Sequence, residues 1–122
     1  MMITILMIFF HVAIAQTELT FNIADKPTVF YQYDEARLMS NKPCKSATKG
    51  KLCSDFEFLK KMKLPKSEAA MDRSALGSVL CRESLDGIII IGINPVSKSQ
   101  NSFCKMDDLM VDIGTINYYG SR

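Results

Sequence analysis

The sequence predicts an α+β fold: a small antiparallel sheet whose central strand lies at about residues 88–93, two or three short helices, and two disulfides. Three observations predict this fold. Apolar and β-branched runs, several of them alternating with polar residues, indicate strands. Segments rich in helix formers stand between the strands. Four cysteines in a short chain with an export signal indicate two disulfides.

The central strand is the run IIIIGI at residues 88–93. Asp86-Gly87 precedes it and Asn94-Pro95 follows it, and these dipeptides are typical of turns. Six residues are too few to span a membrane as a helix. Because isoleucine occupies both faces of the strand, we expect both faces to be covered, one of them by a helix.

Two strands are predicted before the helical segments. In residues 17–24, TELTFNIA, the apolar Leu19, Phe21 and Ile23 alternate with polar residues, as in a half-buried strand. Residues 28–33, TVFYQY, are rich in β-branched and aromatic side chains, so they are interpreted as a second strand, or as an extended segment that leads into the helix-prone residues 34–39.

The residues after the central strand predict a three-stranded meander. Residues 102–106 and 109–113 are apolar and partly alternating, and Asp107-Asp108 between them indicates a turn. We expect residues 115–119 to continue the edge of this meander.

Two helices are predicted in the middle of the chain. Ser54 followed by Glu57 matches a capping box, which places a helix start there. A second helix is expected at about residues 75–85, with Ser74 as its cap and Gly87 as its stop. A strand at residues 78–82 is the alternative for that segment.

The first fifteen residues are typical of a secretory signal peptide. They carry no charged side chain and end in Ala13-Ile14-Ala15, a small-residue cleavage pattern. The alternative, a membrane anchor, needs about 20 apolar residues. We therefore expect an exported protein, periplasmic or extracellular and not membrane-spanning after cleavage, with a single domain at residues 16–122.

Histidine chemistry is excluded from that mature domain, because the sole histidine, His11, lies in the signal peptide. Catalytic triads, Cys-His pairs and histidine metal sites all need this residue. Carboxylate, lysine or tyrosine chemistry is left open. We predict no catalytic residue, no cofactor and no metal.

All four cysteines, Cys44, Cys53, Cys81 and Cys104, lie in the mature domain. Their spacing lacks a C-x-x-C pair, so disulfides are favoured over a zinc site. Cys44 and Cys53 flank a polar, lysine-rich loop, which makes a local bridge between them plausible.

Positive charge is concentrated in residues 42–66, which carry eight lysines against Asp55 and Glu57, a local balance of +6. Such a segment suits an anionic envelope component or an acidic protein as partner. Its alternative is an ordinary solvated face. The candidate binding residues are Lys60, Lys61, Lys63 and Lys66. Nucleic acid is not expected as a partner, given the export signal and the modest net charge.

Residues 75–120 resemble a family of small exported bacterial domains often labelled "haemolysin". ALGSVLC at 75–81 stands at the family's first cysteine motif, CKMDDL at 104–109 at its second, and Tyr118-Tyr119-Gly120 at its aromatic element. Asp112 and Ser121 stand where the family has its third and fourth cysteines. If those two pair with each other in the family, the resemblance implies a Cys81–Cys104 bridge here, with Cys44–Cys53 as the local one.

The function of that family is not established, so the resemblance assigns no activity. Our leading hypothesis is a bacterial cell-envelope or secreted binding or structural module that is not an enzyme. One alternative is a carboxylate-dependent cell-wall glycan hydrolase, for which Asp107, Asp108 and Asp112 form the tightest acidic cluster. Another is a secreted enzyme inhibitor that presents Lys98 from the loop at 94–101.

Overall fold

The computed structural model describes residues 16–48, 50–63 and 75–121 of the 122-residue chain. The predicted signal peptide, the predicted cap Ser74 and the candidate Lys66 lie outside the described residues. In chain order the elements are β1 (Gln16–Ile23), β2 (Lys26–Tyr33), β3 (Leu38–Ser40), the 3-10 helix η1 (Ser54–Lys61), α1 (Leu76–Glu83), β4 (Ile88–Ile93), β5 (Gln100–Met106), β6 (Leu109–Asp112) and α2 (Ile113–Gly120).

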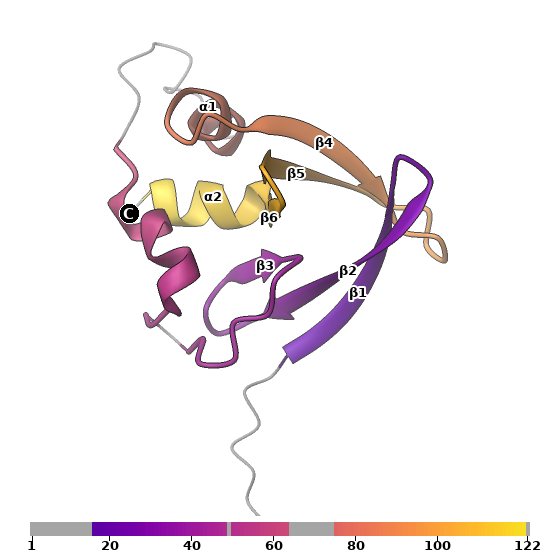
Figure 1. Cartoon of the computed structure of the whole chain (residues 1–122), viewed down its shortest axis with the longest axis horizontal. Helices are drawn as coiled ribbons and strands as arrows, with labels where there is room; N and C mark the ends of the chain where they lie inside the picture. Colours follow the sequence, from indigo (N-terminus) through magenta and orange to yellow (C-terminus); the bar gives the residue numbers. More distant parts are fainter. Residues whose placement is uncertain (1–15, 49, 64–74, 122) are drawn as a thin grey trace, which may run out of the picture.

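The six strands form a closed antiparallel barrel in the order β1-β2-β3-β6-β5-β4 (Figure 1). The predicted fold class, a small sheet with residues 88–93 at its centre, is therefore wrong, although the two disulfides and the short helices are present. Five of the six strands lie where they were predicted, whereas β3 was missed because its residues were expected to be helix-prone. Closure depends on Ile23 facing Gly92 across 69 residues of chain. Such long-range pairing follows from the twist of the whole sheet.

A cluster of aromatic side chains fills the barrel. Phe30 and Phe103, both fully buried, stack with ring centroids 4.2 Å apart, and Phe21 meets them edge-on at 5.6 and 5.3 Å. Leu19, Ile23 and Ile90 pack against this cluster. The alternation predicted for β1 is thus confirmed, because its three apolar residues all join one cluster.

A second apolar layer lies between the barrel and the helices, which gather on the left in Figure 1. There α2 contacts both α1 and η1. The close approach of α1 to α2 depends on Gly77, where an added Cβ would lie 2.6 Å from the Ile113 carbonyl oxygen. The Cys81–Cys104 disulfide crosses this layer and ties α1 to β5.

The central isoleucine strand forms as predicted, but its expected burial is wrong. In β4 the side chains of Ile88, Ile91 and Ile93 are 60%, 55% and 41% exposed. A β-branched run is enough to specify a strand. Which of its faces is covered depends on neighbours elsewhere in the chain, and α1 lies over only part of β4.

The C-terminal segment was predicted as an edge strand and is instead the helix α2. The Asp112 carboxylate accepts a hydrogen bond from the Thr115 N–H at 3.3 Å and caps the first turn. Ile116 and Tyr119, three residues apart, are then buried on one side. Cap and packing together outweigh the strand propensity of isoleucine, threonine and tyrosine in this stretch.

The two helices predicted in the middle of the chain are present with changed details. α1 lies within the predicted 75–85, so the alternative strand at 78–82 is wrong. The predicted helix start at Ser54 is also found, but the element is a 3-10 helix whose N-cap is Cys53. No capping box forms at η1, since no side chain caps it.

Candidate functional site

The lysine-rich segment, as far as it is described, lies at one end of the molecule and consists of two parts. The first is the loop from Lys42 to Cys53, and the second is η1 with the residues just after it (Figure 1). The Lys60 ammonium donates a 2.8 Å hydrogen bond to the Gly50 carbonyl and joins the two parts. Six lysines of this segment are exposed: Lys42, Lys45, Lys51, Lys60, Lys61 and Lys63. We call these six the lysine face.

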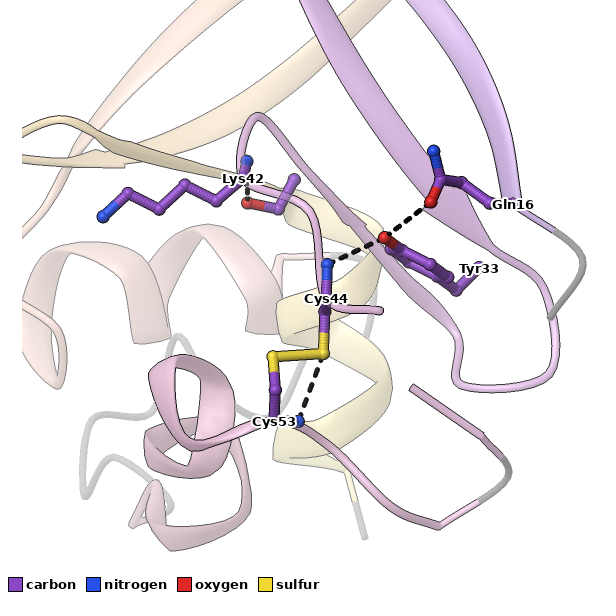
Figure 2. The surroundings of a disulfide bond; sticks show 6 residues. Gln16, Tyr33, Lys42, Cys44 and Cys53 are labelled. Carbon is purple, nitrogen blue, oxygen red and sulfur yellow. Dashed lines mark hydrogen bonds between the residues drawn. A yellow bond between two sulfur atoms is a disulfide. The ribbon is translucent and has the colours of Figure 1, made fainter. Parts of the chain in front are cut away.

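A disulfide and a hydrogen-bond chain hold the loop of the lysine face in place. Cys44 and Cys53 are bridged, and the Cys53 N–H also donates to Cys44 Sγ at 3.1 Å. The Cys44 N–H donates to Tyr33 Oη at 2.7 Å, and that hydroxyl donates to Gln16 Oε1 at 3.1 Å, as Figure 2 shows. The loop is therefore tied to β1 and β2.

Apolar anchors hold η1 to the same surface. Phe56 and Leu59 are fully buried in the second apolar layer, between the barrel and the helices, so the opposite side of η1 faces solvent. This side carries Lys60 and Lys61, while Asp55 and Glu57 lie in its first turn. Basic residues at the end of the helix and acidic ones at its start also suit the helix dipole.

The lysine face carries a local balance of +4 from six lysines against Asp55 and Glu57. None of the six forms an ion pair within the part of the chain that the structure describes. Three of the four candidate binding residues, Lys60, Lys61 and Lys63, belong to it. Lys42, Lys45 and Lys51 were already counted in the basic segment 42–66, and the local bridge holds their loop at the same end.

A pocket of about 480 Å³ lies between the β2–β3 region and α2, and no motif in the sequence indicated it. Its polar lining includes Asp34, Arg37 and Asp112, and the Arg37 guanidinium lies 5.4 Å from the centre of the Tyr118 ring. Burial raises the pKa of Asp112 above the ordinary value for an aspartate, although hydrogen bonds from Thr115, Asn101 and Gly114 partly oppose this.

Two polar groups that line this pocket, Asp112 and Thr115, hold the fold together. Asp112 Oδ2 caps α2, and Oδ1 accepts a hydrogen bond from Asn101 Nδ2 at 3.1 Å. Thr115 Oγ1 accepts the Met39 N–H at 3.0 Å. Because Asp112 and Thr115 are committed to the fold in this way, we interpret the pocket as structural.

The acidic cluster suggested for a glycan hydrolase does not come together. Asp107 and Asp108 form the exposed β5–β6 turn, whereas Asp112 lies at the other end of β6. The carboxylate that shares the pocket with Asp112 is Asp34, which lies 78 positions away in sequence. No pattern in the sequence pointed to that pair.

The loop proposed for an inhibitor is a tight turn. Asn94 Oδ1 accepts the N–H groups of Val96 and Ser97 at 2.9 and 3.0 Å, and β5 begins at Gln100. Lys98 is exposed and has a positive φ of 63°. These features are ordinary for a connection between two antiparallel strands.

The described residues contain neither a candidate metal site nor a helix that could cross a membrane. Within residues 16–48, 50–63 and 75–121, no group of three or more His, Cys, Asp or Glu side chains could hold a metal ion. The helices found in those same ranges are all too short or too polar to cross a membrane.

Comparison of the chain with protein-family models, with curated proteins and with solved structures finds no match. The resemblance of residues 75–120 to the bacterial family stays a prediction. The Cys81–Cys104 pairing that it implies is present in the structure, as is the local Cys44–Cys53 bridge.

Proposed function

We propose that this chain is an exported bacterial cell-envelope or secreted protein that binds an anionic component of the envelope through the lysine face. The observation that carries the proposal is the anchoring of six exposed lysines. A loose basic loop would lose conformational freedom on binding, whereas a loop held by a disulfide has already lost it. The export signal and the two disulfides support an oxidising compartment.

We further propose that the protein acts by binding and not by catalysis. The mature chain contains no histidine, which removes the commonest general base. The carboxyl group with the raised pKa, Asp112, has both oxygens engaged in structural hydrogen bonds. The glycan-hydrolase and inhibitor alternatives have no comparable support from the described residues.

The test measures binding of the purified protein to two kinds of lipid vesicle, phosphatidylglycerol mixed with phosphatidylcholine and phosphatidylcholine alone. We expect binding to the anionic vesicles only, and weaker binding as salt rises from low to above physiological concentration. Binding that ignores salt would count against the lysine face.

Two matched triple variants locate the binding surface. Lys45, Lys61 and Lys63 changed to Glu reverse charge on the lysine face, whereas Lys26, Lys98 and Lys105 changed to Glu do so elsewhere. All six lysines are exposed. Each basic residue near an anionic surface contributes about 1 kcal/mol, so the first variant should bind at least about a hundredfold more weakly. Equal losses in both variants would mean that only net charge matters.

A further inference from the structure

The strand that closes the barrel leaves most of one edge unpaired. β4 pairs with β5 over all six of its residues, from Ile88↔Lys105 to Ile93↔Gln100. With β1 it pairs at two positions only, Asn22↔Ile93 and Ile23↔Gly92. Figure 1 shows β1 and β4 meeting at the right and diverging from there. Within residues 88–91, alternate residues therefore point their backbone N–H and C=O groups away from β5, and no described strand pairs with those groups.

This edge lacks the features that usually protect a sheet edge. Proteins block exposed edges with lysine, proline, bulges or very short strands, because an open edge pairs readily with another chain. Residues 88–91 are four consecutive isoleucines, and Ile88 and Ile91 are 60% and 55% exposed. Apart from β5, no element among the described residues forms backbone hydrogen bonds with these four positions.

We propose that β4 pairs antiparallel with β4 of a second copy of this chain, so that the two sheets join edge to edge across a two-fold axis. An axis through Ile89 places Ile89 opposite its own copy and Ile88 opposite Ile90. It also keeps the new pairing clear of Gly92 and Ile93, which β1 occupies. This proposal does not depend on the lysine face.

The chemistry of the edge favours a second copy as the occupant. The partner must supply an extended strand that is apolar on both faces and uncharged, and β4 itself is such a strand. A two-fold pairing consumes the edge of both copies and ends at a dimer. Pairing with the other open edge, residues 16–21 of β1, would instead propagate, and that edge begins with the exposed polar residues Gln16, Thr17 and Glu18.

The contact is short, so the dimer should be weak. Stable dimers bury about 20–30 residues on each side, whereas this pairing involves about five. We expect a dissociation constant in the micromolar range. Light scattering and sedimentation from about 1 to about 500 µM protein measure the molecular mass and so detect the dimer. Hydrogen exchange at both ends of that range should show slower exchange at high concentration for those amides of residues 88–91 that point away from β5.

Two single variants distinguish an effect of the β4 edge from an effect of exposed apolar side chains in general. Ile91→Lys places a charge on the edge, and Val96→Lys changes a 90% exposed valine in the neighbouring turn. We expect Ile91→Lys to raise the dissociation constant about tenfold or more and Val96→Lys to leave it unchanged. Circular dichroism checks that both variants fold.

Three outcomes would overturn the proposal. The first is a wild-type protein that stays monomeric at the highest concentration, with the amides of residues 88–91 that point away from β5 exchanging freely. The second is an equal effect of the two variants. The third is growth beyond the dimer, which would mean head-to-tail pairing with β1.

Discussion

The two disulfides of this protein lie in contrasting surroundings. Cys81–Cys104 joins α1 to β5 across 23 residues, and both of its cysteines are fully buried. Packing around it leaves no spare room, since a Cβ added to Gly87 would lie 2.5 Å from Cys104 Sγ. Cys44–Cys53 links two cysteines nine positions apart beneath a surface loop, and here Cys44 is fully buried whereas Cys53 is half-buried.

The two disulfides therefore have different roles: Cys81–Cys104 holds the fold together, and Cys44–Cys53 shapes a surface. The buried bridge links the helix layer to the barrel, so its removal affects contacts throughout the domain. The surface bridge affects the loop of the lysine face and the hydrogen bond from Cys44 to Tyr33. The same chemical bond thus stabilises the whole domain in one place and orders a candidate binding surface in the other.

Removal of the buried bridge should have the largest effect. In the chain-entropy relation, a loop of this length contributes about 3.5 kcal/mol, so Cys81→Ala with Cys104→Ala should lower the free energy of unfolding by at least that amount. Urea denaturation followed by circular dichroism measures it. A loss smaller than that from the other disulfide would contradict the contrast.

Removal of the surface bridge should cost less and act locally. Cys44→Ala with Cys53→Ala should lower the free energy of unfolding by about 2.5 kcal/mol. Hydrogen exchange should become faster in residues 42–61 before it changes in β5, and binding to anionic vesicles should weaken as the lysines lose their fixed arrangement. Unchanged exchange in the loop would show that the bridge does not order it.

The smallest predicted effect on stability concerns Asp112, whose side chain caps the first turn of α2. Asp112→Ala removes a cap and should lower the free energy of unfolding by about 1 kcal/mol, whereas Asp112→Asn keeps a capping oxygen and should lose less. Denaturant unfolding of both variants beside the wild type measures the difference.

The same residue predicts a pH dependence. Because burial raises the folded-state pKa of Asp112, the folded state binds its proton more tightly than the unfolded chain does. The stability that this group contributes is therefore complete below about pH 3.9, the ordinary pKa of an aspartate, and is lost as pH rises through the raised value. Asp112→Asn should lack this loss, and a parallel pH profile in that variant would contradict the prediction.

Much of the local structure was predictable because it depends on neighbours in the chain. The alternation of Leu19, Phe21 and Ile23 predicted β1, and the turn-forming dipeptides on either side of residues 88–93 predicted β4. Segments whose local preference is weak or mixed were misjudged. The stretch after Asp112 has strand propensity, yet a cap and the burial of Ile116 make it helical.

The candidate surface was half predictable. Lys60, Lys61 and Lys63 stand close together in the sequence, so their grouping needed no structure. Their position next to Lys42, Lys45 and Lys51 depends on tertiary structure. The Cys44–Cys53 bridge and the burial of Phe56 and Leu59 bring the loop and η1 to one end. The pocket lined by Asp34 and Asp112 joins residues too distant in sequence for any motif to reveal.

By itself the sequence determined five of the six strands, the approximate positions of η1 and α1, and the concentration of lysines, because backbone preference and side-chain alternation act over a few residues. Tertiary structure alone decided that the sheet closes into a barrel, that Ile88 and Ile91 remain exposed, and that one edge of β4 stays open. These features depend on how six twisted strands meet, and two pairings between β1 and β4 complete that closure.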